Sequence, residues 1–217
     1  MNRKGIITGW LKIVIGLLVF SLGVHLTIRA NLGLAPWDCL CMGISFKTPL
    51  NYGISMTIIS VTVLFIDILM KEKIGFGTII DALLTGNAVQ FFSDIDPFPE
   101  TESIFCGILI ITGGLVLMAV GQYLYMSSAQ CCGPRDALLV GLGKKLKRLP
   151  IGAVQIILWG LVLLTGWLLG GPVGIGTSVS TFGSGIVMQI VFTYIGFEPR
   201  LVEHQSVIDA SKILYKG

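Results

Sequence analysis

The chain has 217 residues, of which 53% are hydrophobic and only 12% charged, with a formal net charge of +3 and a mean hydropathy of +0.86. A soluble domain carries about 25% charged residues, so this chain cannot cover itself with a polar surface. The composition therefore excludes a soluble enzyme or a nucleic-acid-binding domain, and it predicts a polytopic all-α membrane protein whose main partner is the lipid bilayer.

Six segments have the roughly 20 mostly apolar residues that a membrane helix needs. They are 7–28, 51–70, 76–93, 104–126, 151–170 and 175–197. Two further helices, 36–47 and 134–148, are too short to span and both begin at a Pro-x-Asp sequence. The end of the chain, 199–217, mixes apolar and charged residues and is predicted to be a cytoplasmic amphipathic tail.

The two Pro-x-Asp sequences belong to an internal repeat. Residues 33–38 read Gly-Leu-Ala-Pro-Trp-Asp and residues 131–136 read Cys-Cys-Gly-Pro-Arg-Asp. Residues 75–78 read Gly-Phe-Gly-Thr and residues 174–177 read Gly-Ile-Gly-Thr. Other matched positions are Gly16 with Gly114, Gly23 with Gly121, Gly53 with Gly152, Gly86 with Gly185, and Gln90 with Gln189. The chain is therefore predicted to consist of two membrane repeats, 1–99 and 100–198.

The basic residues predict the orientation of the spans, because Lys and Arg favour the cytoplasmic side. In a six-span arrangement four basic groups fall on one side: Arg3 and Lys4; Lys71 and Lys73; Arg135, Lys144, Lys145, Lys147 and Arg148; and Arg200, Lys212 and Lys216. Both termini are then cytoplasmic. Since each repeat has three spans, the second repeat enters the membrane upside down, an arrangement common in transporters.

The sequence leaves the depth of the two Pro-x-Asp helices open. A proline suits the first helical position and an acid suits the first turn, so both can be interfacial helices with good starts. They can equally be re-entrant half-helices whose N-termini point at the midplane, provided that their irregular backbone lines protein or a water-filled cavity.

The Leu-Gly-Leu-Ala-Pro-Trp-Asp stretch at 32–38, together with the later Gly-x-Gly-Thr, resembles the bacterial YczE/YyaS/YitT-type integral membrane proteins. The resemblance covers most of the chain and implies a multi-pass protein of the bacterial plasma membrane. It implies no substrate. Arg135 stands in the second repeat where Trp37 stands in the first, so the two halves are not chemically equivalent.

Charged residues inside a bilayer are costly and are candidates for function. The candidate binding residues are Trp37, Asp38, Arg135, Asp136, Asp81, Asn87, Gln90, Gln189, His25 and Tyr123. Several polar and aromatic residues can instead have an ordinary structural role. Asp81 and His25 can be hydrated near the interface, Asp67 can pair with Lys71 at the surface, and Trp159 can face lipid.

No P-loop, G-x-S-x-G or H-E-x-x-H motif is present, and the five cysteines show no paired metal-site spacing. The sequence thus predicts no cofactor, no metal and no enzyme activity. The favoured function is transport or conduction of a small solute or ion at the repeat interface. A membrane regulator or assembly partner is the alternative, an intramembrane enzyme using Asp38 or Asp136 is a distant third, and homo-oligomerisation is left open. Arg135 suits an anion, whereas the three aspartates suit a cation or proton.

Overall fold

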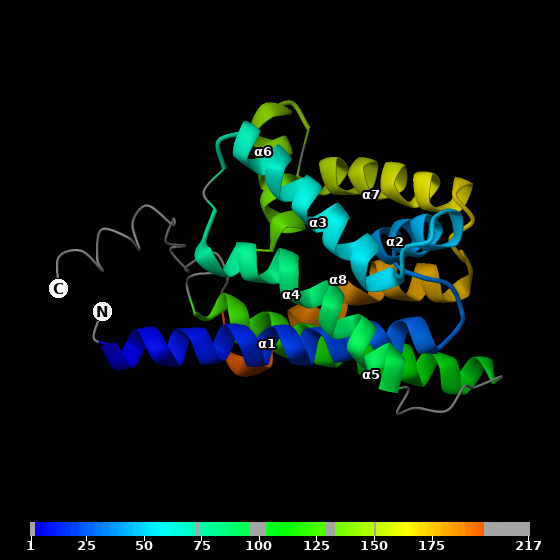
Figure 1. The fold of residues 1–217 in the computed structure, drawn as a ribbon, viewed down its shortest axis with the longest axis horizontal. Coiled ribbons are helices and arrows are strands. Elements are labelled where there is room, and N and C mark those ends of the chain that lie inside the picture. The colour runs from blue at the N-terminus through cyan, green and yellow to red at the C-terminus, as the bar shows by residue number, and fades with distance from the viewer. Residues whose placement is uncertain (1–2, 73, 96–102, 129–132, 150, 198–217) are drawn as a thin grey trace.

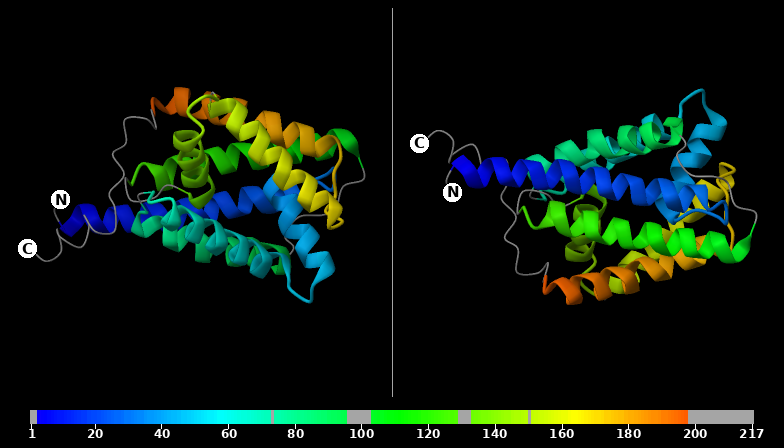
Figure 2. Two further views of the ribbon diagram at one scale, coloured as in Figure 1. Left: turned by 90° about the horizontal axis from the view of Figure 1, so that it is seen from above. Right: turned by 90° about the horizontal axis from the view of Figure 1, so that it is seen from below.

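The computed structural model describes residues 3–72, 74–95, 103–128, 133–149 and 151–197, and within them every regular element is a helix (Figures 1 and 2). The helices are α1 (Arg3–Arg29), α2 (Pro36–Lys47), α3 (Tyr52–Leu69), α4 (Phe76–Ile95), α5 (Ile104–Met126), α6 (Pro134–Lys145), α7 (Ile151–Leu168) and α8 (Ile175–Ile195). Each predicted helical segment corresponds to one of them. The predicted tail at 199–217 lies outside the described residues.

Four of these helices are long and apolar enough to cross a membrane: α1 over Thr8–Arg29, α3, α5 and α8. The other two segments predicted to span, α4 and α7, are not among these four. α4 carries Asp81 and Asp94 besides two amides, and the apolar stretch found in α7 runs only over Ala153–Leu168.

The centre of the bundle is the crossing of α1 and α5, where glycines let the two backbones touch. A Cβ added at Gly16 would lie 2.8 Å from the carbonyl oxygen of Gly121, and one added at Gly23 would lie 2.6 Å from that of Gly114. Small residues at such crossings allow the close packing that holds membrane helices together. Because Gly16 matches Gly114 and Gly23 matches Gly121 in the repeat, each repeat presents the same two glycines to the other.

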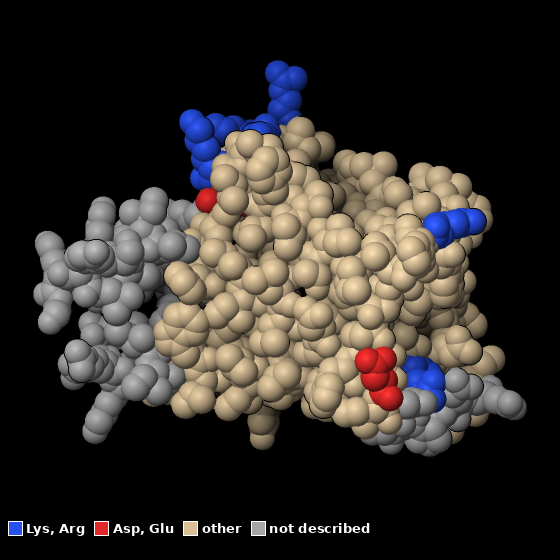
Figure 3. Space-filling view, in the orientation of Figure 1, with Lys and Arg blue, Asp and Glu red and all other residues tan. Residues whose placement is uncertain are grey.

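The outer face of the bundle is apolar. Large side chains exposed on it include Phe65, Phe105, Ile156, Phe182 and Tyr194. Figure 3 shows a largely uncharged face on which Lys and Arg side chains gather over α6, and Lys144 and Lys145 are exposed there. Such an exterior would aggregate in water, and it suits an environment of lipid chains.

Candidate functional site

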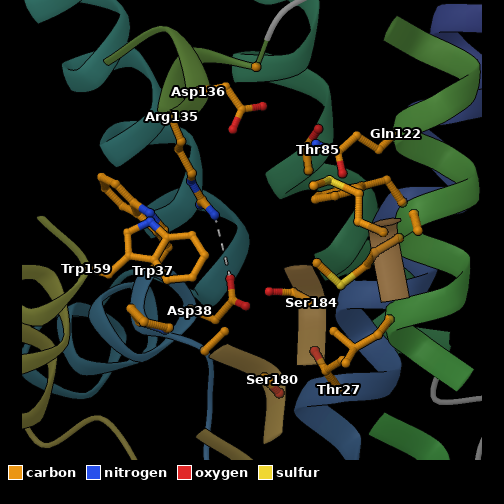
Figure 4. Close-up of a pocket in the computed structure, with 18 of the residues that line it drawn as sticks. Thr27, Trp37, Asp38, Thr85, Gln122, Arg135, Asp136, Trp159, Ser180 and Ser184 are labelled. Atoms are coloured by element: carbon orange, nitrogen blue, oxygen red, sulfur yellow. Dashed lines mark ion pairs between the residues drawn. The ribbon is translucent and has the colours of Figure 1, made fainter. Parts of the chain in front are cut away.

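A cavity of about 270 Å³ lies inside the bundle, and all eight helices contribute to its wall (Figure 4). Its polar and aromatic lining residues are Phe20, Thr27, Trp37, Asp38, Ser60, Asp81, Thr85, Gln122, Tyr125, Arg135, Asp136, Gln155, Trp159, Ser180, Thr181 and Ser184. Pockets that bind small molecules are concave and mostly apolar with a few converging polar groups, and this cavity has that character.

The first turn of α2 reaches the cavity because the loop before it is held in an irregular conformation. Gly33 has a φ of +103°, which favours glycine, and the next backbone N–H, of Leu34, donates to the carbonyl of Pro172. The Gly-x-Gly-Thr sequence at the start of α8 accommodates this loop. A Cβ at Gly174 would lie 2.5 Å from the carbonyl oxygen of Leu32 and one at Gly176 2.8 Å from that of Gly33. Pro36 then occupies the first turn of α2.

The two Pro-x-Asp helices meet at a charged pair. Nη1 of Arg135 lies 3.9 Å from Oδ1 of Asp38, and the guanidinium carbon lies 5.1 Å from the centre of the Trp37 ring (Figure 4). The hydroxyl of Tyr52 donates a 2.9 Å hydrogen bond to the same Asp38 oxygen.

Two further carboxylates approach each other beside Gly133, the residue before α6. A Cβ placed on Gly133 would lie 3.3 Å from Oδ2 of Asp81 and 3.4 Å from Oδ2 of Asp136. The hydroxyl of Thr85 donates to the Asp81 carboxylate. A like charge nearby disfavours ionisation, so this pair is suited to holding a proton or a cation.

Two buried polar atoms of the cavity wall have no hydrogen-bond partner among the described residues. They are Nη2 of Arg135 and Oγ of Ser180, and Ser180 is 2% exposed. Buried polar groups are nearly always satisfied by protein, water or ligand. A solute that bonds to both atoms would therefore supply interactions that the protein itself leaves unmade.

The structure brings Trp37, Asp38, Arg135, Asp136 and Asp81 together around the cavity. The other five predicted binding residues, Asn87, Gln90, Gln189, His25 and Tyr123, are not among its lining residues.

Those five residues have other surroundings. Asn87 is exposed and donates to a carbonyl of its own helix, and Gln189 is exposed and bonds to Thr193. Gln90 instead joins α3 to α4 by accepting a 3.1 Å hydrogen bond from the backbone N–H of Gly53. His25 is buried at 2% exposure, and the ring of Tyr123 packs on Phe197.

Sequence reasoning missed the polar face of α8 and assigned two other residues wrongly. Ser180, Thr181 and Ser184 line the cavity, and with Thr177 they follow the i, i+3, i+4, i+7 spacing of one helix face, a signal that was available. Trp159 lines the cavity instead of facing lipid. Asp67 is fully buried, so the predicted surface pair with Lys71 was wrong.

Comparisons with known proteins agree with the resemblance in the sequence. The model of DUF6198, a family of unknown function, matches residues 7–193. An uncharacterised protein of Haemophilus influenzae is 30% identical over 87% of this chain and 85% of its own length. Two Bacillus subtilis proteins are also similar. The uncharacterised membrane protein YczE is 26% identical over 86% of each chain, and the uncharacterised protein YyaS is 30% identical over 81% of this chain and 88% of its own. No solved structure matches.

Proposed function

The chain belongs to DUF6198, and from that starting point we propose that it is a multi-pass protein of the bacterial plasma membrane that carries or conducts a small solute or ion. The observation that supports this most is the Asp38–Arg135 pair in the wall of a cavity inside an apolar bundle. A charged side chain at the centre of a bilayer costs roughly 2.5–3.5 kcal/mol on insertion scales. Binding of a solute would explain why the protein keeps charged side chains that cost this much in a bilayer. Such a role requires no covalent chemistry.

The proposed architecture is six spans in two inverted repeats, with α4 and α7 crossing besides α1, α3, α5 and α8. The helix pairs that pack closely support it. The repeat matches α1, α2, α3 and α4 with α5, α6, α7 and α8, and three contacts of the first repeat have their counterparts. The α1–α4 contact corresponds to α5–α8, the α2–α3 contact to α6–α7, and the cross-repeat contact α2–α7 to α6–α3. At the α1–α5 crossing Gly16 meets Gly121 and Gly23 meets Gly114, which is the reciprocal pattern that a two-fold axis imposes.

In this arrangement α2 and α6 are re-entrant helices that enter from opposite sides. Their contact through Arg135 and Trp37 supports this, because two helices lying on opposite membrane surfaces would be separated by the ~30 Å hydrocarbon layer. The basic end of α6 and the start of α1 lie toward the same end of the molecule, while α2 lies toward the other (Figure 1). We place the first of these ends in the cytoplasm, with both termini.

The test is solute flux after loss of one charge. A thermal-shift screen on the purified protein first identifies a solute that binds. Asp38→Asn keeps an oxygen that can accept from Tyr52 but removes the charge that faces Arg135. We expect this variant to reach the membrane at near wild-type levels and to lose flux of that solute in proteoliposomes.

The chain offers a matched control. Lys144 and Glu72 form a second ion pair between the two repeats among the described residues, and Glu72 is not among the cavity's lining residues. Glu72→Gln therefore removes a cross-repeat charge without changing the proposed site, and it should leave flux intact. Full flux in the Asp38→Asn protein would contradict the proposal. A protein that transports nothing but co-purifies with a fixed partner would favour the regulator or assembly alternative.

A further inference from the structure

The two repeats differ at one helix pair. In the first repeat α3 and α4 are in close contact, since a Cβ at Gly86 would lie 2.5 Å from the carbonyl oxygen of Gly53 and Gln90 bonds across the same interface. In the second repeat Gly185 and Gln189 stand at the matching positions of α8. A Cβ at Gly185 would meet nothing within 4 Å, and Gln189 bonds only within its own helix in the described contacts. The interface between α7 and α8 is therefore open, whereas the matching interface between α3 and α4 is closed.

The space between α7 and α8 continues into the cavity. We call it the lateral opening and define it by Gln155 and Trp159 on α7 and by Thr181, Ser184, Gly185 and Met188 on α8, all of which line the cavity. Gly185 is itself exposed, and so are Phe182, Ile186 and Gln189 on the same face of α8. The cavity wall and the outer surface therefore meet at this glycine.

The rim of the lateral opening is strongly apolar. Phe182 and Ile156 are each 74% exposed, and Ile186 is 62% exposed. Phe182 and Ile186 lie in the middle part of α8, and Ile156 lies in the second turn of α7. At that depth the surroundings of a spanning bundle are acyl chains.

We propose that the lateral opening admits an amphiphile from the bilayer, with polar groups held at Arg135 and at Ser180, which lie apart on either side of Asp38 (Figure 4), and with its apolar tail lying between α7 and α8. This rests on the proposed function and names the chemical class of the solute. The unpartnered Arg135 Nη2 and Ser180 Oγ provide the polar end of the site. The apolar rim provides the other end. A solute with no apolar part would gain nothing from an entrance that faces lipid.

Fluorescence quenching by brominated lipid tests the entrance. Trp10, Trp159 and Trp167 are changed to Phe, which leaves Trp37 in the cavity wall as the only indole. The protein is reconstituted in phosphatidylcholine whose acyl chains carry bromine near their middle, and in the same lipid without bromine. We expect brominated chains to quench Trp37.

Two glycines supply a matched pair of variants. A Cβ at Gly185 or at Gly160 would meet nothing within 4 Å, but only Gly185 lines the cavity. Gly185→Leu should fill the lateral opening and remove most of the quenching. Gly160→Leu adds the same bulk to the lipid-facing side of α7 and should leave the quenching unchanged.

Three results would overturn the proposal. Equal Trp37 fluorescence in the two lipids means that the opening is closed or is covered by a second copy of the chain. Equal effects of the two leucine variants mean that chains enter elsewhere. If the single-tryptophan protein fails to fold, Ser184→Cys in a cysteine-free chain replaces it, and it should react with a lipid-soluble maleimide. Reaction only with a charged, water-borne maleimide would mean that the solute comes from water.

Failure of this inference is distinguishable from failure of the proposed function. Loss of flux in Asp38→Asn with an unquenched Trp37 would retain the transporter and remove the lateral entrance. Quenching of Trp37 that Gly185→Leu abolishes, with no flux of any amphiphile tested, would retain the entrance and remove transport.

Discussion

Positions 37 and 135 match in the repeat but carry different residues. The contact between these two side chains explains the difference. Trp37 and Arg135 occupy matching places in the two repeats and lie 5.1 Å apart, measured from guanidinium carbon to ring centre. A two-fold axis brings matching residues face to face, so two arginines here would repel each other in a dry interior. An arginine over an indole attracts instead. The contact thus turns a symmetric junction into an asymmetric site with one positive charge.

The carboxylate of Asp136 should make stability depend on pH. Its Oδ2 atom and that of Asp81 both lie close to Gly133, and like charges this near repel each other, so the folded protein is more stable when one of the two acids is neutral. That stability is present under mildly acidic conditions and is lost as pH rises and both acids ionise. We expect the purified protein to melt at a lower temperature at neutral pH than under mildly acidic conditions, and Asp136→Asn should reduce this difference. The check is thermal unfolding in detergent at a series of pH values, and an Asn variant with the wild-type pH profile would contradict it.

At the scale of single helices, glycines decide which interfaces are tight. The Gly-x-Gly-Thr sequence of α8 packs on the loop before α2, and Gly53 and Gly86 bring α3 and α4 together. The same residue type at Gly185 faces open space. Matching sequence therefore does not ensure matching contact, because packing also depends on how the neighbouring helix is placed.

Alanine substitutions at matched glycines measure this difference. Gly86→Ala puts a Cβ against the backbone of α3, which cannot move aside as a side chain would, and overpacking of this kind costs about 1–3 kcal/mol. Gly185→Ala adds the same methyl group to empty space and should be tolerated. We expect a lower melting temperature for the first variant and a wild-type value for the second. Equal melting temperatures would mean that α3 and α4 are not packed as described.

For the whole molecule, the proposed inverted arrangement predicts which segments face outside. Lys144 on α6 pairs with Glu72 just after α3, so the ends of these two helices lie on one side. α4 starts at Phe76, a few residues after Glu72, and ends at Ile95, at the opposite end of that helix. The six-span proposal places the ends of α3 and α6 in the cytoplasm and the 95–103 segment outside.

Cysteine labelling in intact cells tests this topology. After the native cysteines are removed, a cysteine in the 95–103 segment should react with a membrane-impermeant maleimide, and cysteines at positions 72, 146 and 210 should be protected until the cells are opened. External labelling at position 146 would mean that the second repeat runs in the same direction as the first, and the inverted arrangement would be wrong.

Features that depend on neighbours in the chain could be predicted from the sequence. The eight helices of the described residues and their Pro-x-Asp starts follow from apolar length and from proline's fixed φ, whereas the division into two repeats, drawn from glycines at constant spacing, stays a prediction. Four of the five predicted binding residues that line the cavity do so for the same reason, since Trp37, Asp38, Arg135 and Asp136 sit in the first turns of the two Pro-x-Asp helices.

Only the tertiary structure decided which polar side chains face the cavity. Gln90 and Gln189 occupy matching positions, yet one joins two helices and the other is exposed, because α4 has a close neighbour where α8 has an opening. Ser180 and Trp159 line the cavity, and Asp67 is buried, because of how their helices are rotated about their own axes. In a chain that is apolar on nearly every face, hydrophobic periodicity cannot set that rotation. Backbone contacts at a few glycines set it instead.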